Sequence, residues 1–242
     1  MRLDVYRSAG FLVTRRVPRP GYNAPDLLPS LIVSASSDVA TFIPDVWSIA
    51  WCGVEPSERR AEAAKLGIAP ERVDGLVAAV TTRIADAERY GWPNIAYTLE
   101  AAWEMARLAA PEGGLTVLEL GLAASDVPAL LEASASPEPA PGTAPLGEPG
   151  VRIALRRDAA VLATGRPLGF EPLCFNVALG CSWLCNGLEV PVARVLGIRP
   201  NSSGLLSDPE ESRRAVAYIS RDDVGAEPGL WLPWLLLEHS IA

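Results

Sequence analysis

The chain has 242 residues, a formal net charge of −8 and 49% hydrophobic residues. A chain of this length forms one large domain or two small ones, and it can bury enough surface to fold without disulfides or metal. Nucleic-acid binding depends on basic patches, so the negative charge speaks against that class of protein. The longest apolar runs, such as Leu230–Leu237, are far shorter than the roughly 20 residues that span a bilayer, so we expect no membrane segment.

The compartment is expected to be the cytoplasm. No apolar stretch follows Met1–Asp4, as a secretory signal would require. Four cysteines in a chain of this length do not resemble a disulfide framework. The acidity favours solubility and would attract a basic partner over long distances, but charge alone identifies no partner.

Residues 134–150 are rich in Pro, Ala, Gly and Ser and predict a linker or long loop. They divide the chain into an N-terminal half, residues 1–133, and a C-terminal half, residues 151–242. The two halves could be separate domains or pack as one. Strand and helix patterns occur in both halves, so we expect an α/β or α+β fold with a mixed sheet and a helical middle segment.

The N-terminal half starts with two strand patterns, Gly10–Thr14 and Leu31–Ser34. Three helices are predicted next, and each begins at a residue suited to a helix N-terminus: Ser57, Pro70 and Asn94. The second has apolar residues every three or four positions from Val73 to Ala87. In the third, the residues expected to be buried are Leu99, Ala102, Trp103 and Ala106. A strand over Leu115–Leu120 and a short helix opening at Asp126 complete this half.

The C-terminal half starts with Val151–Leu155, whose alternating pattern predicts a strand. The apolar stretch Phe170–Leu188 is expected to belong to the core. Ser207 can cap a helix together with Glu210. Pro233 interrupts the final apolar run, which predicts an edge strand or a helix that begins near this proline.

The cysteines Cys174, Cys181 and Cys185 form the densest cluster of reactive side chains, and Cys52 would be the fourth ligand of a metal site. Their neighbours are strongly apolar and no CxxC pair is present, so we interpret these thiols as core residues and expect neither a metal nor a cofactor. His239 is the single histidine. Its place near the C-terminus predicts a solvated side chain and argues against a catalytic triad.

Two groups of carboxylates could act chemically. Glu100 and Glu104 lie one helical turn apart and could serve as acid and base, but a solvated helix face with a Glu104–Arg107 ion pair is the favoured interpretation. The second group could hold a divalent cation but is interpreted as a solvated loop, and it consists of Asp222, Asp223 and Glu227.

Two aromatic groups are candidate binding surfaces, because Tyr and Trp are enriched at binding hot spots. The first surrounds a predicted turn and consists of Tyr90, Trp92 and Tyr97. The second, with polar neighbours, consists of Trp183, Asn186, Glu189, Trp231 and Trp234. Packing in the core is the alternative for each tryptophan.

With one histidine and one lysine, the chain has few acid–base groups, which favours a binding protein over an enzyme. The leading hypothesis is a protein-interaction module, such as an immunity or inhibitor protein that binds a basic partner. The alternatives are an enzyme whose pocket is built from scattered residues such as Tyr97, Glu100, Asn186 and Glu189, and a subunit of a homo-oligomer with an apolar patch at Trp231 and Trp234.

Overall fold

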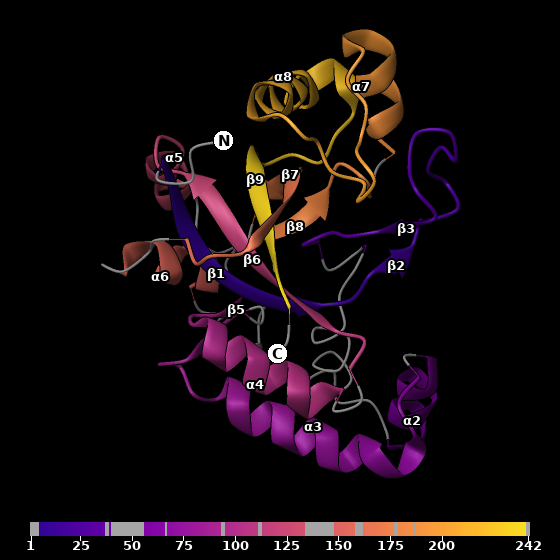
Figure 1. Ribbon diagram of the computed structural model, residues 1–242, viewed down its shortest axis with the longest axis vertical. Helices are drawn as coiled ribbons and strands as arrows, with labels where there is room; N and C mark the ends of the chain where they lie inside the picture. Colours follow the sequence, from indigo (N-terminus) through magenta and orange to yellow (C-terminus); the bar gives the residue numbers. More distant parts are fainter. Residues whose placement is uncertain are drawn as a thin grey trace, which may run out of the picture.

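The computed structural model describes residues 5–36, 39, 56–65, 67–92, 95–110, 113–133, 148–157, 162–176, 179–185 and 187–240. Within them the chain forms a curled seven-stranded sheet with helices packed around it (Figure 1). Every described pairing between named strands is antiparallel, so the α+β alternative of the predicted fold class is confirmed. None of the described helices is both long enough and apolar enough to cross a membrane.

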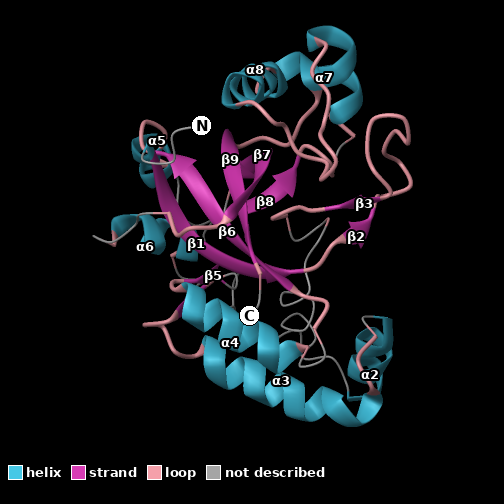
Figure 2. Ribbon diagram, viewed as in Figure 1, coloured by secondary structure: helices cyan, strands magenta, loops and turns pink. Residues whose placement is uncertain are grey.

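The strand order in the large sheet is β4-β5-β1-β6-β9-β7-β8. Its strands are β1 (Tyr6–Thr14), β4 (Tyr90–Gly91), β5 (Ile95–Ala96), β6 (Thr116–Ala123), β7 (Arg166–Phe175), β8 (Leu179–Ser182) and β9 (Leu230–His239). Strands from both sides of residues 134–150 therefore share one sheet. A separate pair of short strands, β2 (Val17–Pro18) and β3 (Leu31–Ile32), lies beside it (Figure 2).

The described helices are α2 (Pro56–Lys65), α3 (Pro70–Ile84), α4 (Leu99–Ala109), α5 (Val127–Glu132), α6 (Gly150–Arg156), α7 (Glu189–Leu196) and α8 (Pro209–Ile219). Figure 1 shows α3 with α4 at one end of the molecule and α7 with α8 at the other. The predicted helices after Ser57 and Pro70 and the helical middle segment are confirmed. A short 3-10 helix spans Asp222–Val224.

Three apolar clusters join these helices to the sheet. One packs α3 and α4 against Phe11 and Val117, and another packs α7 and α8 against Phe170, with the neighbouring strands contributing to each. The third cluster includes Leu118 of β6, together with residues of α5 and α6. Because neighbouring strand residues point to opposite faces, Val117 and Leu118 serve different clusters, and the sheet is covered on both faces.

The prediction of a strand over Val151–Leu155 is wrong, because these residues lie in helix α6. Val151, Ala154 and Leu155 are buried, and their spacing of three and four residues is the helical period. A segment of seven residues fits both periods, so alternation alone did not separate strand from helix. Arg152, which the strand pattern would turn to solvent, is buried in the helix.

The last apolar run is a strand, but the prediction of an edge strand or a helix is wrong, because β9 lies between β6 and β7. Pro233 is directly opposite Pro172 of β7. Neither proline has an N–H to donate, so this pair fits a position of the ladder at which the two strands exchange no hydrogen bonds. On the other side, the described pairing of β9 with β6 ends at Leu235, two residues before Pro233 is reached.

Two predicted helix caps differ from the structure. The hydroxyl of Thr98 caps α4 by accepting the N–H of Ala101, and the proposed cap Asn94 lies outside the described residues. Helix α8 is capped by Asp208 rather than by Ser207. Its carboxylate accepts the N–H groups of Glu210 and Glu211. In this sequence an aspartate directly before Pro209 is the better acceptor for the first turn.

Candidate functional site

A cavity of about 570 Å³ lies where three strands end beside α4. Arg16 follows β1, Thr116 begins β6, and Glu238 lies at the end of β9. Arg107 comes from the last turn of α4. The full lining consists of Arg16, Arg107, Ala110, Gly113, Gly114, Leu115, Thr116, Glu238 and Ser240.

The antiparallel register of the sheet brings these distant positions together. Thr14 pairs with Thr116, so the residues after β1 lie beside the start of β6. Val117 pairs with His239, which places the end of β9 at the same edge. Arg166 of β7 pairs with Glu238 and adds a further arginine there. Positions 16, 116, 166 and 238 thus converge, and the packing of α4 against β1 and β6 adds position 107, although nothing in their local sequence connects them.

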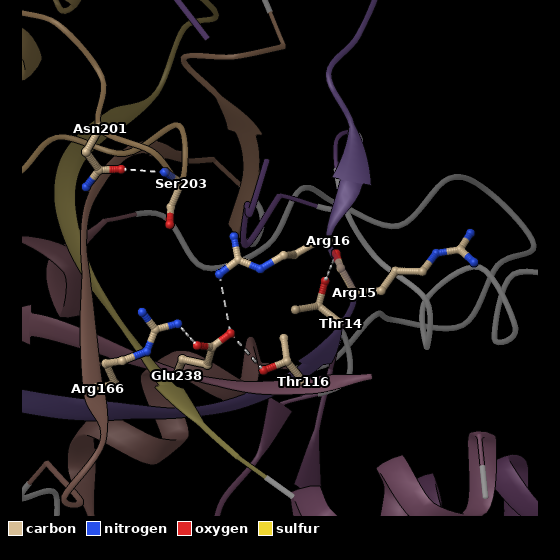
Figure 3. Close-up of polar contacts among 8 residues, drawn as sticks. All are labelled: Thr14, Arg15, Arg16, Thr116, Arg166, Asn201, Ser203 and Glu238. Carbon is tan, nitrogen blue, oxygen red and sulfur yellow. Dashed lines mark hydrogen bonds and ion pairs between the residues drawn. The ribbon is translucent and has the colours of Figure 1, made fainter. Parts of the chain in front are cut away.

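Glu238 is the centre of the polar contacts at this edge, and its side chain is 16% exposed. Oε1 lies 3.5 Å from a guanidinium nitrogen of Arg16 and accepts the hydroxyl of Thr116 at 3.4 Å. Oε2 accepts an N–H of Arg166. Figure 3 shows Arg16, which follows β1, and Arg166 of β7 both reaching this one carboxylate. It also shows the neighbouring loop, in which Asn201 accepts the N–H of Ser203.

Arg107 has an exposed side chain that makes no ion pair within the described part of the chain. The predicted Glu104–Arg107 pair is wrong. Glu104 lies 2.8 Å from Arg83 and 2.5 Å from Arg89 instead. Its hydrogen bond to Arg89 holds the pKa of Glu104 below its ordinary value. Because α3 and the segment after it supply both counter-ions, the guanidinium of Arg107 is left for the cavity.

A second polar group is enclosed in the sheet. His239 is 4% exposed, so the prediction of a solvated terminal histidine is wrong. Its Nε2 lies 3.1 Å from Oε2 of the buried Glu119, whose two oxygens also accept the N–H of Ala163. Neither residue lines the cavity described above. The arrangement completes the hydrogen bonds of a buried carboxylate, which is a structural role.

A third polar group surrounds Glu171, which is fully buried on β7. Its carboxylate accepts the hydroxyls of Ser34 and Ser182 at 2.5 and 2.7 Å and the N–H of Ala35 at 2.8 Å. Burial raises the pKa of Glu171 to about 7, although these three hydrogen bonds act in the opposite direction. The folded protein therefore contains a carboxyl group that titrates near neutral pH.

The aromatic candidates lie mostly inside the molecule. Trp183, Trp231, Trp234 and Tyr90 are buried, in agreement with the alternative of core packing. Trp92 and Tyr97 are half-buried, and the guanidinium of Arg157 lies 3.9 Å from the centre of the Tyr97 ring. Binding by these side chains stays a prediction.

The polar candidates of the second aromatic group are divided. Glu189 is fully buried, and its Oε1 accepts the N–H of Ala24 at 3.1 Å. Asn186 lies outside the described residues.

The remaining candidates are dispersed. Glu100 is exposed, and Asp222, Asp223 and Glu227 are exposed as expected of a solvated loop, with Asp223 paired to Arg221 at 2.6 Å. Cys174 is buried in the core, and burial raises the pKa of its thiol to about 11. Cys181 and Cys185 are half-buried, and Cys52 lies outside the described residues. In the described part of the chain, no group of three or more His, Cys, Asp or Glu residues could hold a metal.

Searches against protein-family models, curated proteins and solved structures found no match to this chain.

Proposed function

We propose that this protein binds a small ligand through a negatively charged group in the cavity lined by Arg16 and Arg107. The observation that carries the proposal is Arg107, an arginine on the cavity wall with no ion pair in the described part of the chain. Guanidinium groups bind carboxylates and phosphates through paired, charge-assisted hydrogen bonds. A cavity of about 570 Å³ is within the range that small-molecule sites occupy.

The chemistry of the wall supports binding rather than catalysis. Its polar side chains are two arginines, one glutamate, a threonine and a serine. General acid–base catalysis works best with a group that titrates near the operating pH. Glu171, whose pKa burial raises to about 7, belongs to an enclosed cluster and does not line this cavity. The enzyme alternative derived from the sequence therefore has less support from this cavity than a binding role has.

The experiment compares Arg107→Ala with a matched control, Arg194→Ala. Arg194 is also an exposed arginine in the last turn of a helix, but it does not line the cavity. Acetate, succinate, citrate and inorganic phosphate are titrated into each protein, and binding is followed by calorimetry and by chemical shifts. We expect at least one anion to bind, with affinity about tenfold or more lower in Arg107→Ala and unchanged in the control.

Binding through a charged pair should also weaken as the salt concentration rises, because salt screens an exposed arginine. If every anion binds Arg107→Ala as tightly as the unaltered protein, the cavity is not the site. If neither these anions nor any other small ligand with a carboxylate binds the unaltered protein at millimolar concentration, the proposed function is wrong.

The net charge of −8 favours a second proposal, in which the chain is a cytoplasmic protein that binds a basic protein partner. Exposed apolar side chains near the start of α7 add support. Tyr22 is 61% exposed and Val190 is 41% exposed, and Ala24 and Glu189 join their segments by a hydrogen bond. The test is retention of one basic protein on the immobilised chain, its release by salt, and its loss with Tyr22→Ala.

Trp231 and Trp234 cannot form the apolar contact patch of a homo-oligomer, since both are buried within one chain.

A further inference from the structure

We infer that the ligand of the cavity is a small zwitterion, an amino acid with one carboxylate and one ammonium group. The inference rests on the proposed function and deepens it, because it uses the negative side chain of the same wall. Glu238 lines the cavity together with Arg16 and Arg107. A ligand with negative charge alone would be attracted by the arginines and repelled by this carboxylate.

Glu238 has room for another hydrogen-bond donor. A carboxylate has about four acceptor positions, and the described contacts of Glu238 are with Arg16, Arg166 and Thr116. Its side chain retains 16% of its surface toward solvent. An ammonium group in the cavity can therefore reach an acceptor without displacing either arginine.

The end of α4 adds negative potential to the same wall. Ala110, the residue at the C-terminal cap of α4, lines the cavity. The C-terminus of a helix carries a partial negative charge, which favours cations within the last turn. Glu238 and this helix end can bind the positive group of the ligand, and Arg107 can bind its carboxylate.

The rest of the wall is small or apolar. Ala110, Gly113, Gly114 and Leu115 contribute no further charged side chain. This part of the cavity can accept an uncharged aliphatic side chain. Of the two arginines on the wall, Arg16 is already paired with Glu238, which leaves Arg107 for the negative charge of a ligand. The wall therefore fits an aliphatic amino acid better than a polyanion.

The experiment uses ligands that differ by one charge. L-Leucine is compared with N-acetyl-L-leucine, which lacks the ammonium charge, and with L-leucinamide, which lacks the carboxylate. Glycine, γ-aminobutyrate and 6-aminohexanoate, with the N-acetyl form of each, vary the distance between the two charges. We expect at least one zwitterion to bind about tenfold or more tightly than its N-acetyl form.

Glu238→Gln tests the residue, with Glu100→Gln, an exposed carboxylate elsewhere on α4, as the control. We expect Glu238→Gln to remove the preference for the zwitterion and the control to keep it. If no zwitterion binds the unaltered protein more tightly than its N-acetyl form, the inference is wrong, and binding of carboxylates that depends on Arg107 would still support the proposed function. If neither zwitterions nor simple anions bind, both proposals fail together. The ligand comparison uses the unaltered protein, so it stands even if Glu238→Gln does not fold.

Discussion

His239 and Glu119 form a side-chain contact of 3.1 Å inside the sheet, between neighbouring strands β9 and β6. The ring of His239 also lies edge-on to Phe11, with centroids 5.8 Å apart. Burial of a carboxylate is costly unless hydrogen bonds compensate it. Glu119 receives such bonds from His239 and from the N–H of Ala163. The pair therefore fixes the end of β9 next to the cavity.

His239→Leu should lower the free energy of unfolding by about 3 kcal/mol, because it leaves a buried carboxylate without its side-chain partner. Glu119→Leu should have a similar effect. The double variant should lose clearly less than the sum of the two, since neither polar group then remains unpaired. Urea denaturation of the four proteins measures this coupling. Simple addition of the two losses would mean that the contact does not contribute to stability.

Glu171 should make the protein less stable as the pH rises. Burial places its pKa at about 7 in the folded chain, above the ordinary value of 4.5. Between these two values the folded chain binds more protons than the unfolded chain, so the free energy of unfolding falls as the pH increases from about 4.5 to about 7. Below this window the group is protonated in both states, so the free energy of unfolding no longer changes with its titration. A pKa shift of this size corresponds to a loss of about 3 kcal/mol in the free energy of unfolding across the window.

Glu171→Gln should flatten this part of the stability profile, because glutamine does not titrate. The measurement is the difference in free energy of unfolding between the unaltered protein and the variant at several pH values from 4.5 to 8. Glu100→Gln, which replaces an exposed carboxylate, should reproduce the profile of the unaltered protein. A Glu171→Gln profile as steep as that of the unaltered protein would show that other groups cause the pH dependence.

The parts of the fold that sequence reasoning predicted are those with a strong local signal. Helix α3 has a proline in its first turn and a stripe of buried residues that includes Val73, Leu76 and Val80. The start of α8 was located because Ser207, Asp208 and Pro209 all favour a helix N-terminus, even though the cap was assigned to the wrong one. The place of β9 in the sheet was missed because a proline indicates an edge strand, and its partner Pro172 lies 61 positions earlier in the chain.

The candidate site could not be predicted in the same way. Arg16 and Glu238 are brought together by the register of β1, β6 and β9, and the packing of α4 on the sheet adds Arg107. No local pattern specifies either. Whether Arg107 forms an ion pair depends on the partner of Glu104, which can be Arg107 on the same helix or Arg83 and Arg89. The packing of α3 on α4 decides between these partners. One signal was present for Glu119, a carboxylate between Leu118 and Leu120 in an apolar strand.

The side chain of Arg152 links helix α6 to the end of α5, and this gives a direct test of the region for which the sequence predicts a strand. The side chain of Arg152 is buried and donates to the carbonyl oxygens of Leu131 and Ala133. These carbonyls lie at the end of α5, where helical partners are missing. A guanidinium reaches both with separate nitrogens, whereas a lysine ammonium at this position cannot reproduce the planar fork.

Arg152→Lys should therefore lower the free energy of unfolding by about 2 kcal/mol, the typical cost of losing a hydrogen bond to a charged group. The control is Arg156→Lys on the same helix. Arg156 pairs with Glu148, but its side chain is 49% exposed, and substitutions at such sites change stability by about 0.5 kcal/mol or less. Urea denaturation of both variants gives the comparison. Equal losses would mean that the two carbonyl contacts of Arg152 do not hold α6 in place.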